Sequence, residues 1–227
     1  MDVFWNEVLT MAMPMPLNTH EEYIKKVEST ASNEGNVLLY GSSFFRRWGV
    51  DRAKQQWSDA TNGALQIINR GFGGATVDEL LYYYNRMVRP CNPKAMVLRT
   101  GVNDIFHGLS AEQCWFQTER LIEWARVDYP GIRFIALKSF DTPSICAVTE
   151  HAGQLLAYNE IMDAYAAEND YISTLDINEF FYKTQSDIGT GKNFKEFFLE
   201  DGLHLTEEGY WEAAQYLAPK VQALLGF

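Results

Sequence analysis

The sequence has little positive charge, and none of it is clustered. Its 19 Lys and Arg residues stand against 30 Asp and Glu, which gives a net charge of −11 at pH 7, and the basic residues come at most in pairs such as Arg46-Arg47. Nucleic acids are bound through basic patches that neutralise phosphates, and anionic bilayers attract the same kind of patch. We therefore expect neither a nucleic acid nor a membrane surface as a partner.

Long apolar stretches are also missing. No uninterrupted apolar run approaches the roughly 20 residues that a helix needs to cross a bilayer. The first residues lack the basic start and the continuous apolar run of a secretory signal, because Asn6, Glu7 and Pro14 interrupt them. These absences predict a soluble, cytoplasmic protein.

Cysteine is scarce. Cys91, Cys114 and Cys146 are an odd number and are not spaced as metal ligands are. This usage is typical of reduced thiols that are buried as small hydrophobic side chains. The sequence therefore indicates no metal site and no other cofactor.

The remaining composition is that of an ordinary globular domain. The chain is 47% hydrophobic, 14% aromatic and 22% charged, which is unlike disordered or fibrous proteins. A length of 227 residues suits one well-buried core. We predict a single domain over residues 1–227, in which residues 1–35 form an N-terminal extension and a helix. The apolar residues among the first 18 are candidates for packing on the domain or on a second subunit, so a homo-oligomer stays open.

Short apolar runs alternate with longer helical patterns along the chain. Strands are expected at residues 37–40, 65–69, 95–99, 132–138 and 171–175, and helices at 19–32, 77–88, 111–129, 153–168 and 207–225. The strands are nearly continuously apolar, as in a parallel sheet with helices on both faces. Ser110 and Thr206 are expected to cap two of the helices. The pattern predicts an α/β fold with a central parallel sheet of about five strands.

Glycine-rich and polar blocks follow the first three expected strands. They read Gly-Ser-Ser at 41–43, Gly-Phe-Gly-Gly at 71–74 and Gly-Val-Asn-Asp at 101–104. The carboxyl ends of parallel strands share one edge of a sheet, where ligands bind, and small residues let backbone amides approach a ligand. A serine at a helix start, exposed amides and the Asn103 side chain are the nucleophile and donors that acyl transfer needs. Asp104 is expected to cap a helix or to support this loop.

A candidate general base lies near the C-terminus. His204 follows Asp201 by three positions, in a turn before the last expected helix. Histidine has a reference pKa of about 6.5, so it accepts protons near neutral pH, and a neighbouring carboxylate orients its ring. Each block alone is also typical of a turn or a helix cap. Their order and their shared sheet edge favour a Ser/His/Asp site, whereas His20 and His151 lie in segments with no comparable partner.

The four blocks resemble the signature blocks of the SGNH, or GDSL-type, hydrolases over residues 37–210. The resemblance implies that Ser43 is the nucleophile and that Asp201 and His204 complete a catalytic triad. It also implies that the Ser43 amide, Gly74 and Asn103 hold the oxyanion. The fold implied is a three-layer α/β/α sandwich of flavodoxin-like type.

The first block departs from the family pattern in one position. The family has Gly-Asp-Ser, and Ser42 stands here in place of the Asp, which is not a triad member. Together with Arg47-Trp48-Gly49, this block resembles a bacterial branch of esterases and acylhydrolases. The implied reaction is ester hydrolysis through an acylated Ser43, with a kcat/KM that falls as the base is protonated near the reference value of about 6.5.

The residues expected to contact the substrate are Ser42, Trp48, Lys138 and Phe140. Ser42 and Trp48 lie near the nucleophile in the sequence, and the other two lie at the end of the fourth expected strand and just after it. The long phenylalanine-rich segment 176–200 is expected to form an aromatic wall. Aromatic side chains suit a sugar face or an acyl chain. The lack of an export signal favours small soluble esters, either short-chain acyl esters or acetylated sugars.

Two interpretations of other classes stay open. The block at 71–74 follows a strand and precedes a helix, a loose match to the dinucleotide-binding fingerprint, although it lacks the third glycine. A non-catalytic ligand-binding descendant of the hydrolase fold would keep the pocket without turnover. A metal hydrolase is disfavoured, because Asp201 and His204 have no further ligands at suitable spacing.

Overall fold

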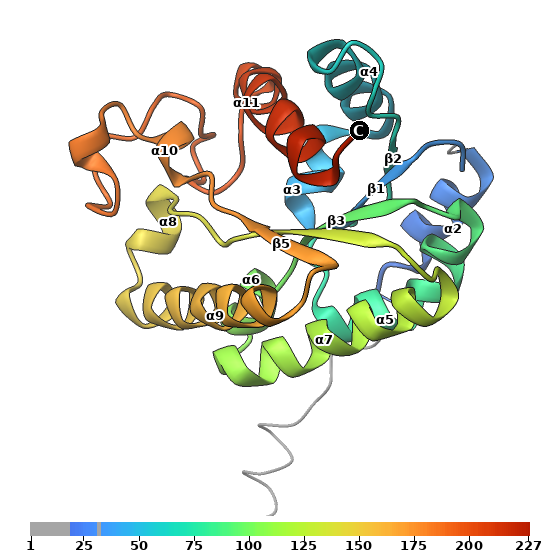
Figure 1. The fold of residues 1–227 in the computed structure, drawn as a ribbon. Helices are drawn as coiled ribbons and strands as arrows, with labels where there is room; N and C mark the ends of the chain where they lie inside the picture. The colour runs from blue at the N-terminus through green and yellow to red at the C-terminus, as the bar shows by residue number, and fades with distance from the viewer. Residues whose placement is uncertain (1–18, 31–32) are drawn as a thin grey trace, which may run out of the picture.

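The computed structural model describes residues 19–30 and 33–227. The first 18 residues, for which packing on the domain or on a second subunit is expected, lie outside the described residues. The rest forms three layers, a twisted sheet between two sets of helices (Figure 1). None of the helices in the described part of the chain has the length and apolarity that crossing a bilayer requires.

Five parallel strands form the central sheet in the order β2-β1-β3-β4-β5. Their bounds are β1 Val37–Gly41, β2 Ile67–Asn69, β3 Ala95–Arg99, β4 Arg133–Leu137 and β5 Ile172–Leu175. In the register of the sheet, Val37 lies opposite both Ile67 of β2 and Ala95 of β3. This order is that of flavodoxin-like sheets. The predicted α/β class and five-stranded parallel sheet are confirmed.

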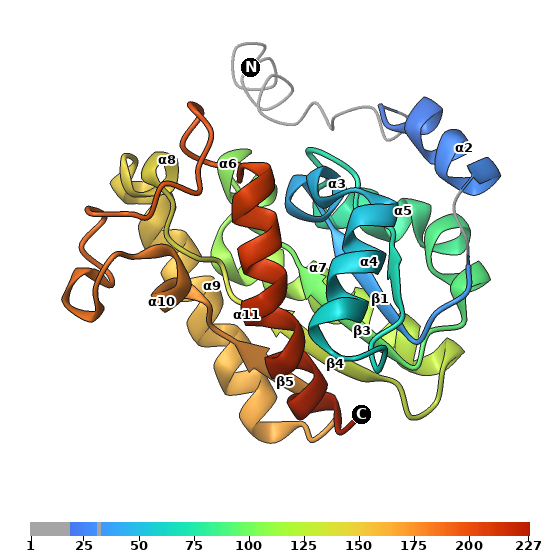
Figure 2. The same cartoon turned by 90° about the horizontal axis from the view of Figure 1, so that it is seen from above.

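Helices cover both faces of the sheet. Successive side chains of a strand point to opposite faces, so Leu38 and Tyr40 of β1 pack with one set of helices, and Val37 and Leu39 pack with the other. The first set is α2 (Glu21–Thr30), α5 (Val77–Met87), α7 (Ala111–Asp128) and α9 (Thr149–Glu168), and the second is α3 (Ser43–Trp48), α4 (Val50–Ala60) and α11 (Glu207–Leu225). Figure 2 shows α4 and α11 side by side. Burial on both faces explains why β1 is apolar at almost every position.

Capping groups fix several helix starts. The Ser110 hydroxyl accepts from the Gln113 N–H at 3.3 Å, and the Thr206 hydroxyl accepts from the Gly209 N–H at 3.0 Å, so both predicted caps are confirmed. Shorter helices occupy the connections, namely α6 (Val102–Phe106), α8 (Pro143–Cys146), α10 (Asn178–Phe181) and the 3-10 turns η1 (Arg89–Cys91) and η2 (Gln185–Asp187).

The rings of the phenylalanine-rich segment 176–200 pack mainly on one another. Pairs that join its two halves are Phe180 with Phe197 at 5.2 Å, Phe181 with Phe198 at 5.4 Å and Tyr182 with Phe194 at 4.6 Å between ring centroids. A single antiparallel bridge joins Tyr182 to Phe194 and another joins Phe198 to Leu205. Because Phe180 and Phe181 also belong to the core on the α11 side of the sheet, these rings tie the segment, and the turn that follows it, to the body of the domain.

Candidate active site

Ser43 lies where β1 passes into α3, at the carboxyl edge of the sheet. A Cβ atom on Gly41 would lie 2.3 Å from the Arg99 carbonyl oxygen of β3, and one on Gly71 would lie 2.5 Å from Phe45 Cβ of α3. Contacts this close leave no room for a side chain, so glycine is required at both positions. The two glycines therefore let β1, β3 and the loop after β2 converge around Ser43, which is half-buried.

Three side chains form a hydrogen-bonded chain at this edge. Ser43 Oγ lies 2.9 Å from His204 Nε2, and His204 Nδ1 lies 2.7 Å from Asp201 Oδ2. Both distances are those of good hydrogen bonds. With its proton on Nδ1, the ring donates to the carboxylate and its Nε2 accepts from the serine hydroxyl. The fold thus brings together a serine and a histidine that are 161 positions apart.

A tight turn holds His204 in place. The Leu199 N–H donates to the His204 carbonyl oxygen at 2.7 Å, and Asp201 Oδ1 accepts from the backbone N–H groups of Leu203 and His204 at 2.9 Å each. Gly202 has a φ of +62°, which favours glycine. One oxygen of the Asp201 carboxylate therefore fixes the backbone of the turn, and the other fixes the ring.

The Asp201 carboxyl is ionised at neutral pH. Burial raises its pKa, but hydrogen bonds from the His204 backbone, the His204 ring and the Leu203 backbone outweigh burial and lower the pKa to about 2. Its side chain is 43% exposed. The Asp201 anion is therefore stabilised by nearby hydrogen-bond donors and not by exposure alone. These donors keep the carboxylate charged, so that it can accept from the His204 ring.

Asn103 and the glycine block after β2 are joined at the same edge. Asn103 Nδ2 donates to the Ala75 carbonyl oxygen at 2.8 Å. An amide nitrogen carries two hydrogens, so the second one is available to a ligand. Gly74, next to Ala75, has a φ of +78°, a conformation that side chains rarely adopt. Ser43 adds a backbone N–H at the first position of α3, where no helical acceptor is present.

A small cavity joins most of these groups. Its volume is about 10 Å³, room for about one water molecule. Its lining is Ser42, Ser43, Phe44, Arg99, Val102, Asn103, Leu203, His204 and Tyr210. Among the predicted substrate contacts, Ser42 lines this cavity, whereas Lys138 and Phe140 line a neighbouring one. Trp48 is fully buried against Trp57 and Tyr210 and belongs to the core of the second helix layer.

Arg99, at the end of β3, lies in the cavity wall, where it was not predicted. Its side chain is buried, with the guanidinium 5.0 Å from the Phe44 ring centroid and 4.2 Å from that of Phe140. Its Nε has no hydrogen-bond partner among the described residues. Burial lowers the pKa of Arg99 to about 10, so the group stays charged at neutral pH. The signal in the sequence is an arginine that ends an otherwise apolar strand.

Asn69 holds α3, the helix that begins with Ser43, against the loop after β2, and this role was not predicted. Its Nδ2 donates to the Phe45 carbonyl oxygen at 2.7 Å and to the Gly49 carbonyl oxygen at 3.1 Å, and its Oδ1 accepts from the Gly71 N–H at 3.0 Å. The side chain is buried. It therefore ties the middle and the C-terminal end of α3 to the loop after β2, and its only sequence signal is a polar residue at a strand end.

Two buried carboxylates, Asp104 and Glu79, lie near the predicted oxyanion donors Asn103 and Gly74 and hold the structure around them. Asp104 Oδ1 accepts from the Val77 N–H at 2.8 Å, so it caps the start of α5, in line with its predicted role. Glu79 lies 3.2 Å from His20 Nε2, and a Cβ on Gly74 would lie 3.9 Å from the His20 ring. No local pattern indicates that pair, because its members are 59 positions apart.

In the ranges 19–30 and 33–227, no three His, Cys, Asp or Glu side chains gather as metal ligands do.

Comparisons with known proteins agree with this fold. The model of the GDSL-like lipase/acylhydrolase family matches residues 39–212. Similar solved structures include a GDSL-like lipase from Bacteroides thetaiotaomicron VPI-5482, with 20% identity, a TM-score of 0.68 and coverage of 92% of this chain and 98% of that one. An acetyl xylan esterase has 20% identity, a TM-score of 0.65 and coverage of 83% and 98%.

A member of the lipolytic protein G-D-S-L family from Veillonella parvula DSM 2008 has 21% identity, a TM-score of 0.61 and coverage of 83% and 98%. No curated protein sequence matches the chain significantly. The family match extends from β1 into α11 and includes all four blocks, up to the turn that carries Asp201 and His204. The chain belongs to the GDSL-like lipase/acylhydrolase family and is a carboxylic ester hydrolase.

Proposed function

We propose that Ser43, His204 and Asp201 are the catalytic triad of an esterase for small soluble substrates, either short-chain acyl esters or acetylated sugars. The observation that carries the proposal is the hydrogen-bonded chain, 2.9 Å from Ser43 Oγ to His204 Nε2 and 2.7 Å from His204 Nδ1 to Asp201. Nucleophile, base and orienting carboxylate have the mutual geometry that acyl transfer requires.

In the first half-reaction His204 Nε2 takes the Ser43 hydroxyl proton as Oγ attacks the ester carbonyl carbon. The carbonyl π electrons move to oxygen, and the resulting oxyanion accepts from the Ser43 N–H, the Gly74 N–H and the free N–H of Asn103 Nδ2. The intermediate then collapses, the bond from carbon to the alcohol oxygen breaks, and the imidazolium gives its proton to the leaving alcohol. Ser43 is left acylated.

The second half-reaction repeats these steps with water. His204 removes a proton from the water molecule, whose oxygen attacks the acyl carbon, and the second oxyanion meets the same donors. Its collapse breaks the bond to Ser43 Oγ, returns the proton to the serine and releases the carboxylic acid. Throughout, the ionised Asp201 keeps the Nδ1–H tautomer and stabilises the imidazolium.

The size of the cavity beside Ser43 supports a short acyl group. About 10 Å³ is room for a group of roughly one heavy atom or a water molecule, not for an extended chain. The acetyl xylan esterase among the similar structures acts on an acetylated sugar polymer, which is in keeping with acetyl esters for this chain. We infer that acetyl is the preferred acyl group.

The test is hydrolysis of p-nitrophenyl esters from acetate to octanoate, and of acetylated sugars, by the wild-type protein and by Ser43→Ala. We expect acetate to give the highest kcat/KM and Ser43→Ala to lose about 10⁴-fold or more, with an unchanged far-UV circular dichroism spectrum. Wild-type rates that rise steadily toward octanoate would contradict the acyl preference. A Ser43→Ala protein that keeps the wild-type rate would contradict the triad.

A further inference from the structure

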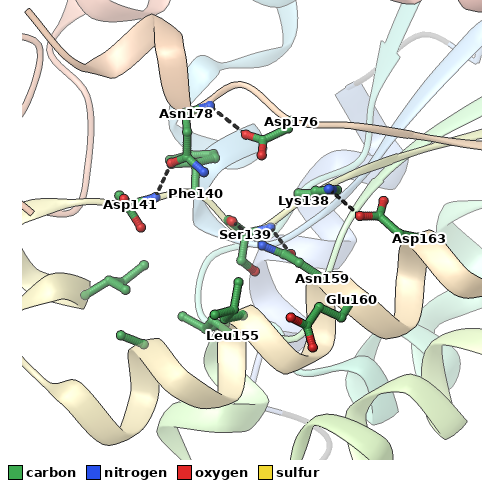
Figure 3. Close-up of a pocket in the computed structure, with 13 residues that line it drawn as sticks. Lys138, Ser139, Phe140, Asp141, Leu155, Asn159, Glu160, Asp163, Asp176 and Asn178 are labelled. Atoms are coloured by element: carbon green, nitrogen blue, oxygen red, sulfur yellow. Dashed lines mark hydrogen bonds and ion pairs between the residues drawn. The ribbon is translucent and has the colours of Figure 1, made fainter. Parts of the chain in front are cut away.

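A second cavity, of about 190 Å³, opens at the carboxyl ends of β4 and β5 (Figure 3). It lies between the loop after β4 and α9, on the sheet edge where ligands of parallel α/β proteins bind. Phe140 forms part of its wall. The same ring lies 5.4 Å from that of Phe44 and 4.2 Å from the Arg99 guanidinium, both of which line the catalytic cavity. The second cavity therefore adjoins the first and is separated from it by this stack.

The loop that lines the second cavity is held rigidly. The Asn159 side chain accepts from the Ser139 N–H at 2.7 Å and donates to the Ser139 carbonyl oxygen at 2.7 Å. Asn178 Oδ1 accepts from the Asp141 N–H at 2.7 Å. Figure 3 shows these contacts at the top and centre of the cavity. A site whose backbone is fixed in advance loses little freedom when a ligand binds.

The Ser139 hydroxyl lacks a hydrogen-bond partner. Ser139 is 5% exposed, and its Oγ has no partner among the described residues. In Figure 3 the side chain points away from the Asn159 contacts, toward Leu155 on α9. A buried hydroxyl without a partner is destabilising, so a ligand that exchanges a hydrogen bond with it would relieve that deficit.

The cavity is strongly acidic. Four carboxylates line it, those of Asp141, Glu160, Asp163 and Asp176, against the single cation Lys138, whose ammonium group pairs with Asp163. In the described part of the chain, no ion pair neutralises the other three. A cleft lined by charges of one sign concentrates ligands of the opposite sign.

The lining favours a primary ammonium group over a quaternary one. Binding of a quaternary ammonium group relies on free aromatic faces, and the Phe140 ring is buried against Arg99 and stacked on Phe181 at 4.5 Å. A primary ammonium has three N–H donors, which suit carboxylates and a serine hydroxyl. Ile145 and Leu155 add buried apolar surface for a short aliphatic chain.

We propose that this cavity binds a small aliphatic primary amine, with the ammonium group at the Ser139 hydroxyl, attracted by the field of the unneutralised carboxylates, and with the alkyl chain along Ile145 and Leu155. The site is distinct from the hydrolytic machinery, so it does not depend on the triad. Binding is measured by ¹H–¹⁵N NMR titration, with n-butylamine as the probe and n-butanol as its uncharged counterpart, at pH 7 and low salt.

We expect n-butylamine to shift the Ser139 backbone and Asn159 side-chain amide signals saturably and n-butanol to leave them unchanged. Glu160→Gln and Asp176→Asn each remove an exposed charge and are expected to weaken binding about two- to fivefold, and Ser139→Ala about tenfold. Glu150→Gln, an exposed change on the same helix outside the lining, is the matched control and is expected to bind as wild type does.

Equal shifts with n-butanol, or an affinity that Glu160→Gln and Asp176→Asn together leave unchanged, would overturn the proposal. The two acidic positions are exposed, so these variants test the site even where Ser139→Ala fails to fold. The titration is repeated on Ser43→Ala. Binding there is expected to match wild type, and this result separates a failure of the amine site from a failure of the proposed hydrolysis.

Discussion

Replacing Asp104 by asparagine is expected to remove a pH dependence from the free energy of unfolding. Burial raises the pKa of the Asp104 carboxyl from 3.8 to about 6, although the hydrogen bond from the Val77 N–H lowers it in part. One unit of pKa corresponds to about 1.4 kcal/mol, so the raised value is worth about 3 kcal/mol.

The sign follows from the direction of the change. Because the folded protein holds the Asp104 proton more tightly than the unfolded chain does, the stabilisation is fully present below the unfolded pKa of about 3.9. It is lost as the pH rises through about 6. Relative to Asp104→Asn, the wild-type protein should therefore lose about 3 kcal/mol of stability between pH 3.5 and pH 7.

Urea unfolding of both proteins at half-unit steps of pH measures this difference. The other titrating groups near Asp104, Asp78 and His107, are present in both proteins, so their contributions largely cancel. The control is Asp78→Asn, which changes an exposed carboxylate in the first turn of α5, the helix whose start Asp104 caps, and which should change the free energy of unfolding by less than about 1 kcal/mol. A difference between wild type and Asp104→Asn that stays flat from pH 3.5 to pH 7 would refute the reasoning.

Three further substitutions test the groups around the nucleophile. Asn103→Ala removes the side-chain donor and should lower kcat about 10²- to 10³-fold in steady-state assays with p-nitrophenyl acetate; an unchanged kcat would exclude Asn103 from the oxyanion site. Gly74→Ala forces a side chain to a φ of +78° without crowding it, so urea unfolding should show a loss of about 1–2 kcal/mol, and a neutral result would contradict the strain argument. Asn69→Ala removes three buried hydrogen bonds and should lower the free energy of unfolding by about 2–3 kcal/mol together with kcat/KM; a stable, fully active variant would show that α3 needs no such tie.

The elements with clear apolar patterns were predictable, and those without were not. The bounds of β3 and α11 agree with the predicted 95–99 and 207–225. Helix α4 was missed because most of its residues are polar, which leaves only a weak apolar period of Val50, Ala53, Trp57 and Ala60. Helix α9 begins at Thr149, and its start was predicted four residues too late because Val148, which precedes it, is not a capping residue that would mark the start in the sequence.

The candidate site divides in the same way. Ser43, Asn103 and His204 were predictable because each lies in a short glycine-containing block next to an expected strand or helix. Arg99 and the contact of His20 with Glu79 were not, because their significance depends on partners far away in the sequence. Trp48 follows the nucleophile closely, but the turn of α3 directs its ring to Trp57 and away from the cavity.

The central claim is that Ser43 is the activated nucleophile, and covalent labelling tests it most directly. A fluorophosphonate reacts with a serine whose hydroxyl is hydrogen-bonded to a general base, as Ser43 is to His204 at 2.9 Å. After incubation with the probe and proteolysis, mass spectrometry should locate a single adduct on Ser43, which His204→Ala should abolish. Failure to label the active wild-type protein, or an adduct on another residue, would contradict the account.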